Sequence, residues 1–284
     1  MNNEEWHQWR RGGIGSSDAA VIMGVSPWRT PKQLWEEKVH GSGAQLDNSA
    51  MMRGRELEPV ARTWFENTMN VTVFPQNKMH AENNWIRASL DGIDLENKIL
   101  VEIKCPNKDD HATAMGKKVP EKYWPQVQHQ LLVTGLDGMY YVSFNGSDGA
   151  IVEVARDNDY IASLLEEEQK FWDLVLSKKA PELTDRDFVS MTKNRTWGNL
   201  EMRWLENKEV LDMAEKLDKE LRASMIECSG NRNAHGNGVR ISKSMCPGLI
   251  DYKKVMADHP NIDWESYRKN SFEKWNFRGT SEIK

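Results

Sequence analysis

The sequence predicts an α/β protein, in which a mixed sheet flanked by helices is followed by a C-terminal extension with a long helix and a small β element. Three observations lead to this prediction. Short apolar runs bounded by turn residues recur between residues 71 and 154, as in strands. Apolar residues at helical spacing stand on both sides of those runs. After Pro181 the composition becomes polar, which marks the extension.

The N-terminal part is expected to be helical, at residues 3–10, 18–23, 31–39 and 51–68. Thr30, Pro31 and Gln33 would occupy the N-cap, N1 and N3 positions of the third helix, which is a capping box. Ser16 or Ser17 can cap the second helix.

The central part supplies the sheet, with strands expected at residues 71–74, 85–90, 99–104, 139–144 and 150–154. Two further helices are expected at residues 124–134 and 160–177, and the apolar spacing of the second predicts that it packs on the sheet. Pro59 lies inside the preceding helical segment. Because proline fits a first turn or a kink, that segment is expected to consist of two pieces.

A domain boundary is expected near residue 185, with a core at residues 1–185 and an extension at residues 186–284. In the extension, residues 200–228 have the composition of one long charged helix. A loop rich in glycine and asparagine follows, and a strand is expected at residues 239–242.

The composition restricts the class of protein. The 284 residues carry a net charge of −5, which argues against a broad basic surface but leaves room for a local basic groove. Three widely spaced cysteines without a CxxC pair indicate reduced thiols. With no secretory leader and no apolar run of membrane-spanning length, we expect a soluble cytoplasmic protein without a membrane partner.

The most informative residues are Asp91, Glu102 and Lys104. A two-residue turn at Glu96 and Asn97 would place Asp91 opposite Glu102 in a hairpin, with Lys104 on the same face. Two carboxylates that close repel each other unless a cation lies between them. The pattern therefore favours a divalent-cation site for phosphodiester cleavage. A turn dipeptide followed by a solvated ion pair explains the same three residues equally well by themselves.

Two further groups of residues are candidates for the same site. Glu58 is a possible third carboxylate, although a surface position on its helix is the commoner explanation. Gln126 and Gln128 could bond phosphates or a metal-bound water, but they also suit an ordinary polar helix face. The histidines lack zinc-ligand spacing and no P-loop occurs, so zinc and an ATP-driven motor are not expected.

The N-terminal segment of Arg10, Ser16 and Ser17 resembles a phosphate cradle, because its glycines permit close backbone approach and a helix N-terminus attracts anions. An ordinary capped helix after a glycine turn is the alternative. Asp18, in the first turn, could interact with the helix dipole or orient Arg10.

Taken in order, these motifs resemble the YqaJ-type viral recombinases, which are grouped with phage lambda exonuclease in the PD-(D/E)XK nuclease superfamily. The resemblance covers about residues 6–175. It is carried by Arg10, the run Gly13-Ile14-Gly15-Ser16-Ser17-Asp18, Gly54-x-x-x-Glu58, Asp91-Gly92, Glu102-Ile103-Lys104-Cys105-Pro106, and Gln126-Val127-Gln128.

The resemblance implies a restriction-endonuclease-like core in which Asp91, Glu102 and the carbonyl of Ile103 bind Mg²⁺. Glu58 would complete the metal site. Lys104 would orient or activate the attacking water. The likeness further assigns Gln126 to a site water or phosphate, and implies two Mg²⁺ ions per site that Mn²⁺ can replace.

By the same resemblance Arg10 and Ser17 would hold the 5′-phosphate of a DNA end, with Ser16 and Gln128 as further DNA contacts. Arg11 replaces Arg10 if the motif is shifted by one residue.

The resemblance implies a Mg²⁺-dependent 5′→3′ exonuclease on double-stranded DNA. It would produce 3′ single-stranded tails for a phage-type annealing protein, work as a homotrimer on DNA ends, and come from a phage or prophage in a bacterial cytoplasm. Two alternatives stay open, namely a structure- or nick-directed endonuclease on the same fold and a non-catalytic protein that binds DNA ends.

Overall fold

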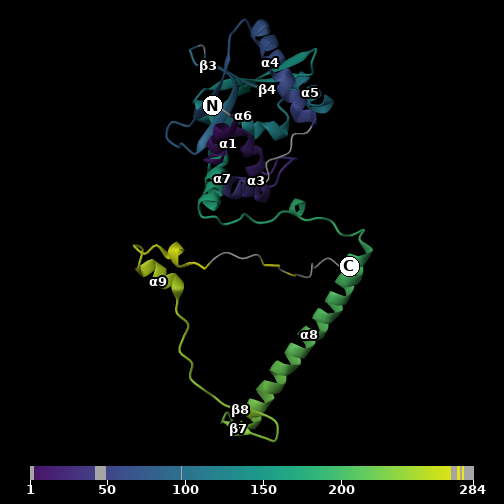
Figure 1. The fold of residues 1–284 in the computed structure, drawn as a ribbon, viewed down its shortest axis with the longest axis vertical. Helices are drawn as coiled ribbons and strands as arrows, with labels where there is room; N and C mark the ends of the chain where they lie inside the picture. The colour runs from purple at the N-terminus through teal and green to yellow at the C-terminus, as the bar shows by residue number, and fades with distance from the viewer. Residues whose placement is uncertain (1–2, 42–48, 97, 270–273, 276, 278–284) are drawn as a thin grey trace. The chain divides into compact units, whose positions relative to one another are not determined.

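The computed structural model describes residues 3–41, 49–96, 98–269, 274–275 and 277. It divides the chain into two compact units, Met1–Val189 and Ser190–Lys284 (Figure 1). The boundary that the sequence placed near residue 185 falls in a short 3-10 helix, η2 (Asp185–Asp187). The side chains of Arg186 and Asp187 bond to the loop at residues 26–30, so this turn belongs with the first unit.

The first unit is built on a six-stranded mixed sheet with the pairing order β1-β3-β4-β5-β6, and β2 also pairs with β3. Its strands are β1 (Ile14–Gly15), β2 (Phe74–Met79), β3 (Ile86–Asp94), β4 (Ile99–Lys104), β5 (Gly138–Phe144) and β6 (Gly149–Ala155). Pairing is parallel for β1 with β3 and for β4 with β5, and antiparallel elsewhere. The mixed sheet that the sequence predicted is therefore confirmed.

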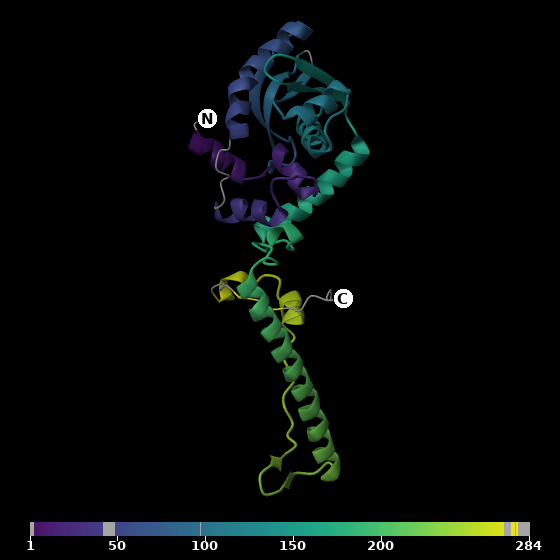
Figure 2. The ribbon, with the colours of Figure 1, turned by 90° about the vertical axis from the view of Figure 1, so that its right-hand side faces the viewer.

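Helices cover both faces of this sheet. They are α1 (Asn3–Arg11), α2 (Ser16–Ile22), α3 (Pro31–His40), α4 (Ser49–Met69), α5 (Lys108–Met115), α6 (Trp124–Thr134) and α7 (Asn158–Leu176). Leu100 packs with α6 in one apolar cluster, whereas Val101 and Ile103 of the same strand pack with α4 in another. Figure 2 shows the helices of the first unit around the sheet from a second side. Since successive strand residues point to opposite faces, α6 and α4 lie on opposite sides of the sheet.

Local sequence signals explain several boundaries. Thr30 caps α3 through the predicted capping box, and Gly41 ends that helix in the left-handed conformation at φ 67°. Helix α6 spans the residues expected for it. In the hairpin, Ile93 pairs with Leu100, which is the register that the sequence predicted. Asn97, half of the predicted two-residue turn, lies outside the described residues.

Some expectations were wrong. The strand expected at residues 71–74 is β2, Phe74–Met79, an exposed and largely polar edge strand that gives no apolar alternation. Elements β1 and α5 were not predicted, because one has two residues and the other lacks an apolar face. Helix α4 is continuous through Pro59 rather than two pieces. Neither serine caps α2. Its N-cap is Gly15, whose N–H donates to the Asp18 carboxylate at 3.0 Å.

The second unit contains the long helix α8 (Arg195–Cys228), a two-stranded hairpin of β7 (Ala234–His235) and β8 (Arg240–Ile241), and helix α9 (Tyr252–Asp258). Helix α8 has no buried residue and exposes apolar side chains along its length, among them Leu200, Leu211 and Leu221. Within the described part of the chain, no helix has the length and apolar character needed to cross a membrane.

Candidate active site

The carboxylates of Asp91 and Glu102 and the ammonium of Lys104 come together where β3 and β4 separate. The ladder between these strands ends at the pair Gly92 and Val101, one pair before Asp91 and Glu102. Beyond it, Asp91 Oδ2 accepts a hydrogen bond of 2.8 Å from the N–H of Ile103. Lys104 Nζ lies 2.6 Å from Glu102 Oε1, as expected for side chains two residues apart on one strand face.

A β-bulge in β3 aims Asp91 at this site. Phe74 of β2 pairs with Ile93 of β3, and Gln76 pairs with Leu90. Two steps along β2 therefore match three steps along β3, so β3 carries one extra residue there. Leu90 and Ile93 consequently lie in the same apolar cluster, although they are three positions apart and would point to opposite faces of a regular strand. The bulge shifts the alternation of faces and places Asp91 on the side of the sheet that faces α6. Gly92, an isolated glycine inside the strand, is the sequence signal that could have indicated this bulge.

Helix α6 fixes the carboxylate of Glu102, which is 1% exposed. Gln126 Nε2 donates to Glu102 Oε1 at 2.5 Å, and Gln130 Nε2 donates to Oε2 at 2.5 Å. The two glutamines are four residues apart and thus share one helix face. Sequence reasoning selected Gln126 but missed Gln130, although the i, i+4 spacing could have identified it.

The charges in this site are strongly coupled. Burial raises the pKa of the Asp91 carboxyl well above its usual value, and the negative charges of Glu102 and Glu58 raise it further. For Lys104, burial lowers the pKa, but Glu102 and Asp91 outweigh that effect and raise it. Lys104 therefore stays protonated at neutral pH, while Asp91 experiences negative charge that the nearby side chains leave uncompensated.

Glu58 lies at the edge of the site on α4. Arg62 connects it to Asp91, because the guanidinium of Arg62 bonds Glu58 Oε1 at 2.6 Å and the backbone oxygen of Asp91 at 2.8 Å. The Pro59 that follows Glu58 leaves α4 unbroken. Arg62 was not among the predicted site residues.

The donor atoms suit a hard divalent cation. Mg²⁺ prefers oxygen ligands and is commonly held by one or two carboxylates while it retains several waters. Asp91 and Glu102 supply two such carboxylates. Burial first, and then the charges of Glu102 and Glu58, raise the pKa of Asp91, and a bound cation would favour its charged form. In the described part of the chain, no group of three or more His, Cys, Asp or Glu side chains is placed to hold a metal ion. A metal here would rest on two carboxylates and backbone or water oxygens.

A second cluster joins α1, α2 and α3. Arg10 donates to Ser17 Oγ at 2.8 Å and pairs with Asp18 Oδ1 at 3.0 Å. Lys38, fully buried, lies 2.6 Å from Asp18 Oδ2 and donates to the backbone oxygen of Arg10 at 3.0 Å. Asp18 is thus a buried anion between two cations, and it holds the Arg10 guanidinium beside the exposed Ser17. Lys38 was not selected from the sequence.

Two predicted phosphate or DNA contacts, Ser16 and Gln128, are buried side chains. Ser16 is buried at the start of α2. Gln128 is fully buried, its Nε2 donates to the backbone oxygen of Ala155, and its Oε1 accepts from the N–H of Asp157. The two bonds of Gln128 tie α6 to the end of β6, so we leave Gln128 out of the proposed site. We leave Ser16 out because its side chain is buried.

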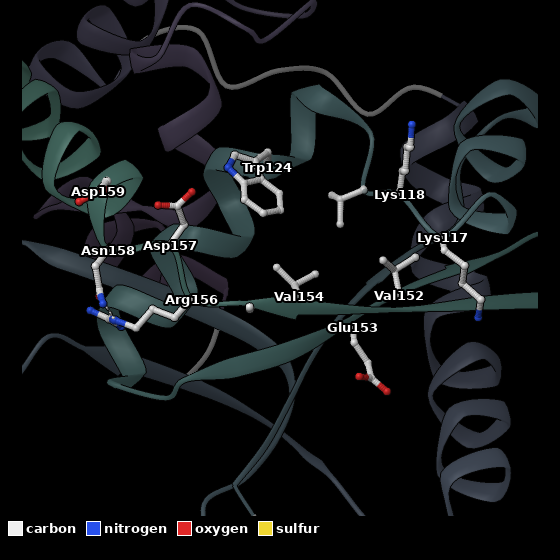
Figure 3. A pocket seen from close by; sticks show the side chains of 12 residues that line it. Lys117, Lys118, Trp124, Val152, Glu153, Val154, Arg156, Asp157, Asn158 and Asp159 are labelled. Atoms are coloured by element: carbon white, nitrogen blue, oxygen red, sulfur yellow. Dashed lines mark hydrogen bonds between the residues drawn. The ribbon is translucent and has the colours of Figure 1, made fainter.

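A pocket of about 860 Å³ opens near that end of β6 (Figure 3). Lys117, Trp124, Val152, Val154 and Arg156 are among its lining residues. The lining includes neither the Asp91 and Glu102 carboxylates nor the Arg10 cluster. The pocket is therefore distinct from the candidate active site.

Comparison with known proteins assigns the N-terminal part. Residues 5–137 match the model of the YqaJ-like viral recombinase domain. This part of the chain is therefore similar to that family. The matched residues include Arg10, Glu58, Asp91, Glu102, Lys104 and Gln126. The resemblance inferred from the motifs is confirmed.

Two proteins are similar to a larger part of this chain than the family model covers. The protein YqaJ of Bacillus subtilis (strain 168) is 26% identical over 307 aligned positions, which cover 99% of this chain and 96% of YqaJ. An alkaline exonuclease from Laribacter hongkongensis, LHK-Exo, has a similar structure, with a TM-score of 0.55, 28% identity, and coverage of 62% of this chain and 94% of its own. A complex of LHK-Exo with dAMP matches with the same TM-score and 27% identity.

Proposed function

We propose that this protein is a Mg²⁺-dependent exonuclease that degrades one strand of double-stranded DNA from an end in the 5′→3′ direction. The observation that carries the proposal is the Asp91, Glu102 and Lys104 cluster, in which Lys104 Nζ lies 2.6 Å from Glu102 on the face covered by α6. The likeness to LHK-Exo, an alkaline exonuclease with a dAMP complex, supports DNA as the substrate class.

Each residue has a defined task in this proposal. Asp91 and Glu102 would hold Mg²⁺, with the carbonyl oxygen of Ile103 and waters as further ligands, while Glu58 stays at the edge of the site, bonded to Arg62. When bound, Mg²⁺ stabilises the attacking and leaving oxygens of a phosphodiester displacement. Two ions per site are proposed, and Mn²⁺ would replace Mg²⁺. Lys104, kept protonated by its carboxylate neighbours, orients the attacking water and offsets charge on the phosphate.

Glutamines and an arginine support these groups. Gln126 and Gln130 fix the rotation of the Glu102 carboxylate, so that its oxygens keep one orientation. Arg62 holds Glu58 near the backbone of Asp91. These residues position other groups, whereas Asp91, Glu102 and Lys104 would contact the reacting atoms.

The Arg10 cluster would hold the 5′-phosphate of the DNA end. Arg10 presents a guanidinium next to Ser17 Oγ, and guanidinium groups bind phosphate with two parallel hydrogen bonds. Because Asp18 pairs with only one side of Arg10 and Lys38 balances its charge, the cluster keeps capacity for an anion. Arg10 rather than Arg11 has this connection to Ser17.

The proposal extends to the biological role. Digestion from 5′ ends would leave 3′ single-stranded tails, which a strand-annealing protein uses in phage-type recombination. A homotrimer that encircles DNA would keep an acidic protein on its substrate without a broad basic surface.

The test is product analysis with a linear duplex labelled at one 5′ end and incubated with Mg²⁺. Release of labelled mononucleotide at the earliest times supports 5′→3′ digestion. Release only after the labelled strand has been digested from its own 3′ end contradicts that polarity. Replacement of Mg²⁺ by EDTA should stop the reaction, and Mn²⁺ should restore it.

Two controls separate the alternatives. A covalently closed plasmid should stay intact, and its cleavage would identify an endonuclease instead. Glu102→Gln should lower the rate at least 100-fold, whereas Glu153→Gln, an exposed glutamate on β6, should digest DNA like the parent. Equal rates for Glu102→Gln and the parent would remove the catalytic assignment.

A further inference from the structure

An aromatic ledge extends from the candidate active site to the protein surface. We define it by Trp28, Tyr123 and the Lys122 ammonium that lies against both rings. The ring centroids of Trp28 and Tyr123 are 6.0 Å apart with an interplanar angle of 32°. Lys122 Nζ lies 5.2 Å from the Trp28 ring centroid and 5.4 Å from that of Tyr123, within the range of cation–π contacts.

The inner end of the ledge contacts the active-site lysine. Lys104 Nζ lies 5.3 Å from the Tyr123 ring centroid, and the same ammonium is 2.6 Å from Glu102. At the outer end Trp28 is 52% exposed, although a large aromatic side chain gains free energy from burial. The Tyr123 ring thus lies between the exposed Trp28 ring and the Lys104 ammonium, which would face the scissile phosphate.

Several bonds hold the ledge in place. Asp110 Oδ2 lies 2.7 Å from Lys122 Nζ and anchors the ammonium between the rings. The loop that carries Trp28 is fixed by Arg186, which donates to the backbone oxygens of Ser26 and Pro27 at 2.7 and 2.8 Å. A preformed surface loses little conformational entropy when a ligand binds to it.

We propose that Trp28 is a substrate-positioning residue that stacks on a nucleobase of the DNA end while the neighbouring phosphodiester lies at Lys104. This inference rests on the proposed function. Aromatic rings beside cations are the combination that binds unpaired nucleic acid, since the ring contacts the base and the cation attracts the phosphate. The two lysines along the ledge favour a nucleic acid over an apolar peptide.

Binding should be measured with EDTA present, so that no cleavage occurs, by titrating protein into fluorescently labelled duplex DNA with a 5′-phosphate. A series of duplexes carries one abasic nucleotide at each of the first three positions of either strand. The proteins are the parent, Trp28→Ala, Trp28→Phe and Trp197→Ala. Trp197 is the matched control because it is 47% exposed on α8, outside the ledge.

Base–aromatic stacking is worth about 1–3 kcal/mol per base, which corresponds to roughly 5- to 100-fold in Kd. We expect Trp28→Ala to weaken binding of the intact duplex by that factor, and Trp28→Phe to restore most of the affinity. One abasic position should weaken the parent to the same extent and have no further effect on Trp28→Ala. Trp197→Ala should bind every duplex like the parent.

Three outcomes overturn the inference. Parent-like affinity of Trp28→Ala for the intact duplex means that no stacking occurs. An equal loss of affinity for intact and all abasic duplexes means that Trp28 contacts the backbone instead of a base. If the parent neither binds nor digests duplex DNA, the proposed function fails as well, which distinguishes that failure from a failure of the ledge alone.

Discussion

Gln130 Nε2 lies 2.5 Å from Glu102 Oε2, and this bond fixes the rotation of a carboxylate that is 1% exposed. Gln126, one helical turn earlier, holds the other oxygen. We expect Gln126→Ala and Gln130→Ala each to lower kcat about tenfold or more, because hydrogen bonds to charged groups contribute about 1.5–3 kcal/mol. KM should change little, since neither side chain contacts DNA in the proposed mechanism. Steady-state kinetics on linear duplex measures both constants.

The matched control on the same helix is Gln128→Ala. Because Gln128 bonds the backbone of Ala155 and Asp157 inside the fold, its loss should lower the unfolding temperature and leave kcat at 20 °C near the parent value. A large loss of DNA affinity in Gln128→Ala, without a loss of stability, would mean that Gln128 contacts DNA after all.

Arg10 should discriminate DNA ends by their phosphate. A linear duplex with 5′-hydroxyl ends should be digested more slowly by the parent than a phosphorylated duplex, roughly tenfold, since guanidinium–phosphate bonds are charge-assisted. Arg10→Ala should digest both substrates at the same reduced rate, whereas Arg11→Ala should keep the preference. Initial rates on the two substrates provide the measurement, and identical parent rates would remove the phosphate site.

Asp18 links stability to acid pH. Its burial raises the pKa of its carboxyl, but the charges of Lys38 and Arg10 outweigh burial and hold that pKa well below its usual value of 3.8. With a lowered folded-state pKa, the stabilisation is fully present above about pH 4 and is lost as the pH falls further.

Asp18→Asn leaves the buried Lys38 unpaired and should cost about 3–5 kcal/mol at pH 7. Urea unfolding of both proteins at pH 7, 5 and 4 measures the difference. It should be constant from pH 7 to 5 and begin to narrow near pH 4. A difference that disappears between pH 7 and 5 would show that another group controls it.

The sequence predicted the layers of the fold because apolar periodicity and capping residues are local signals. The short apolar run in residues 99–104 and the capping box at Thr30 depend only on neighbours in the chain. The hairpin register was predicted by assuming a two-residue turn, and the period of two along a strand placed Glu102 and Lys104 on one face. Edge strand β2 escaped prediction because an exposed strand needs no apolar pattern.

The supporting residues of the site could not be read from the sequence, since they depend on tertiary contacts. Lys38 reaches Asp18 from a different helix, and Arg62 reaches the backbone of Asp91 from α4. The bulge that aims Asp91 arises from pairing with β2, whose position was mispredicted. Trp28 was not selected from the sequence, because nothing local relates it to Tyr123.

The buried pair of His129 and Glu168 predicts that the stability of the fold changes between neutral and alkaline pH. Nδ1 of His129 lies 2.7 Å from Glu168 Oε1, and its Nε2 is 2.8 Å from the backbone oxygen of Arg87. Burial lowers the pKa of His129, but Glu168, the Arg87 carbonyl and the more distant Asp18 outweigh it and raise that pKa. The stabilisation is therefore fully present below about pH 6.5 and is lost as the pH rises through the higher folded-state value.

Glu168→Gln removes the charge that holds the proton on His129. Its loss of stability relative to the parent should be largest at pH 6, about 3 kcal/mol, and smaller at pH 9. Urea unfolding at the two pH values gives the comparison. An equal loss at both would mean that His129 is neutral throughout.

Arg186 should control the order of the loop that carries Trp28. Its two hydrogen bonds to the backbone of Ser26 and Pro27, together with the bond from Thr30 Oγ1 to Asp187, tie η2 to this loop. We expect Arg186→Ala to lower the unfolding temperature of the first unit by roughly 2–6 °C, the equivalent of about 1–2 kcal/mol. Hydrogen exchange should accelerate at residues 26–30.

The second readout is recognition of the DNA end. With the loop less ordered, Arg186→Ala should bind intact duplex more weakly than the parent, by a smaller factor than Trp28→Ala, because the ring is still present but less often in position. Arg203→Ala, on α8 of the second unit, is the control and should leave both exchange and affinity unchanged. Unaltered exchange at residues 26–30 in Arg186→Ala would show that the loop keeps its conformation without η2.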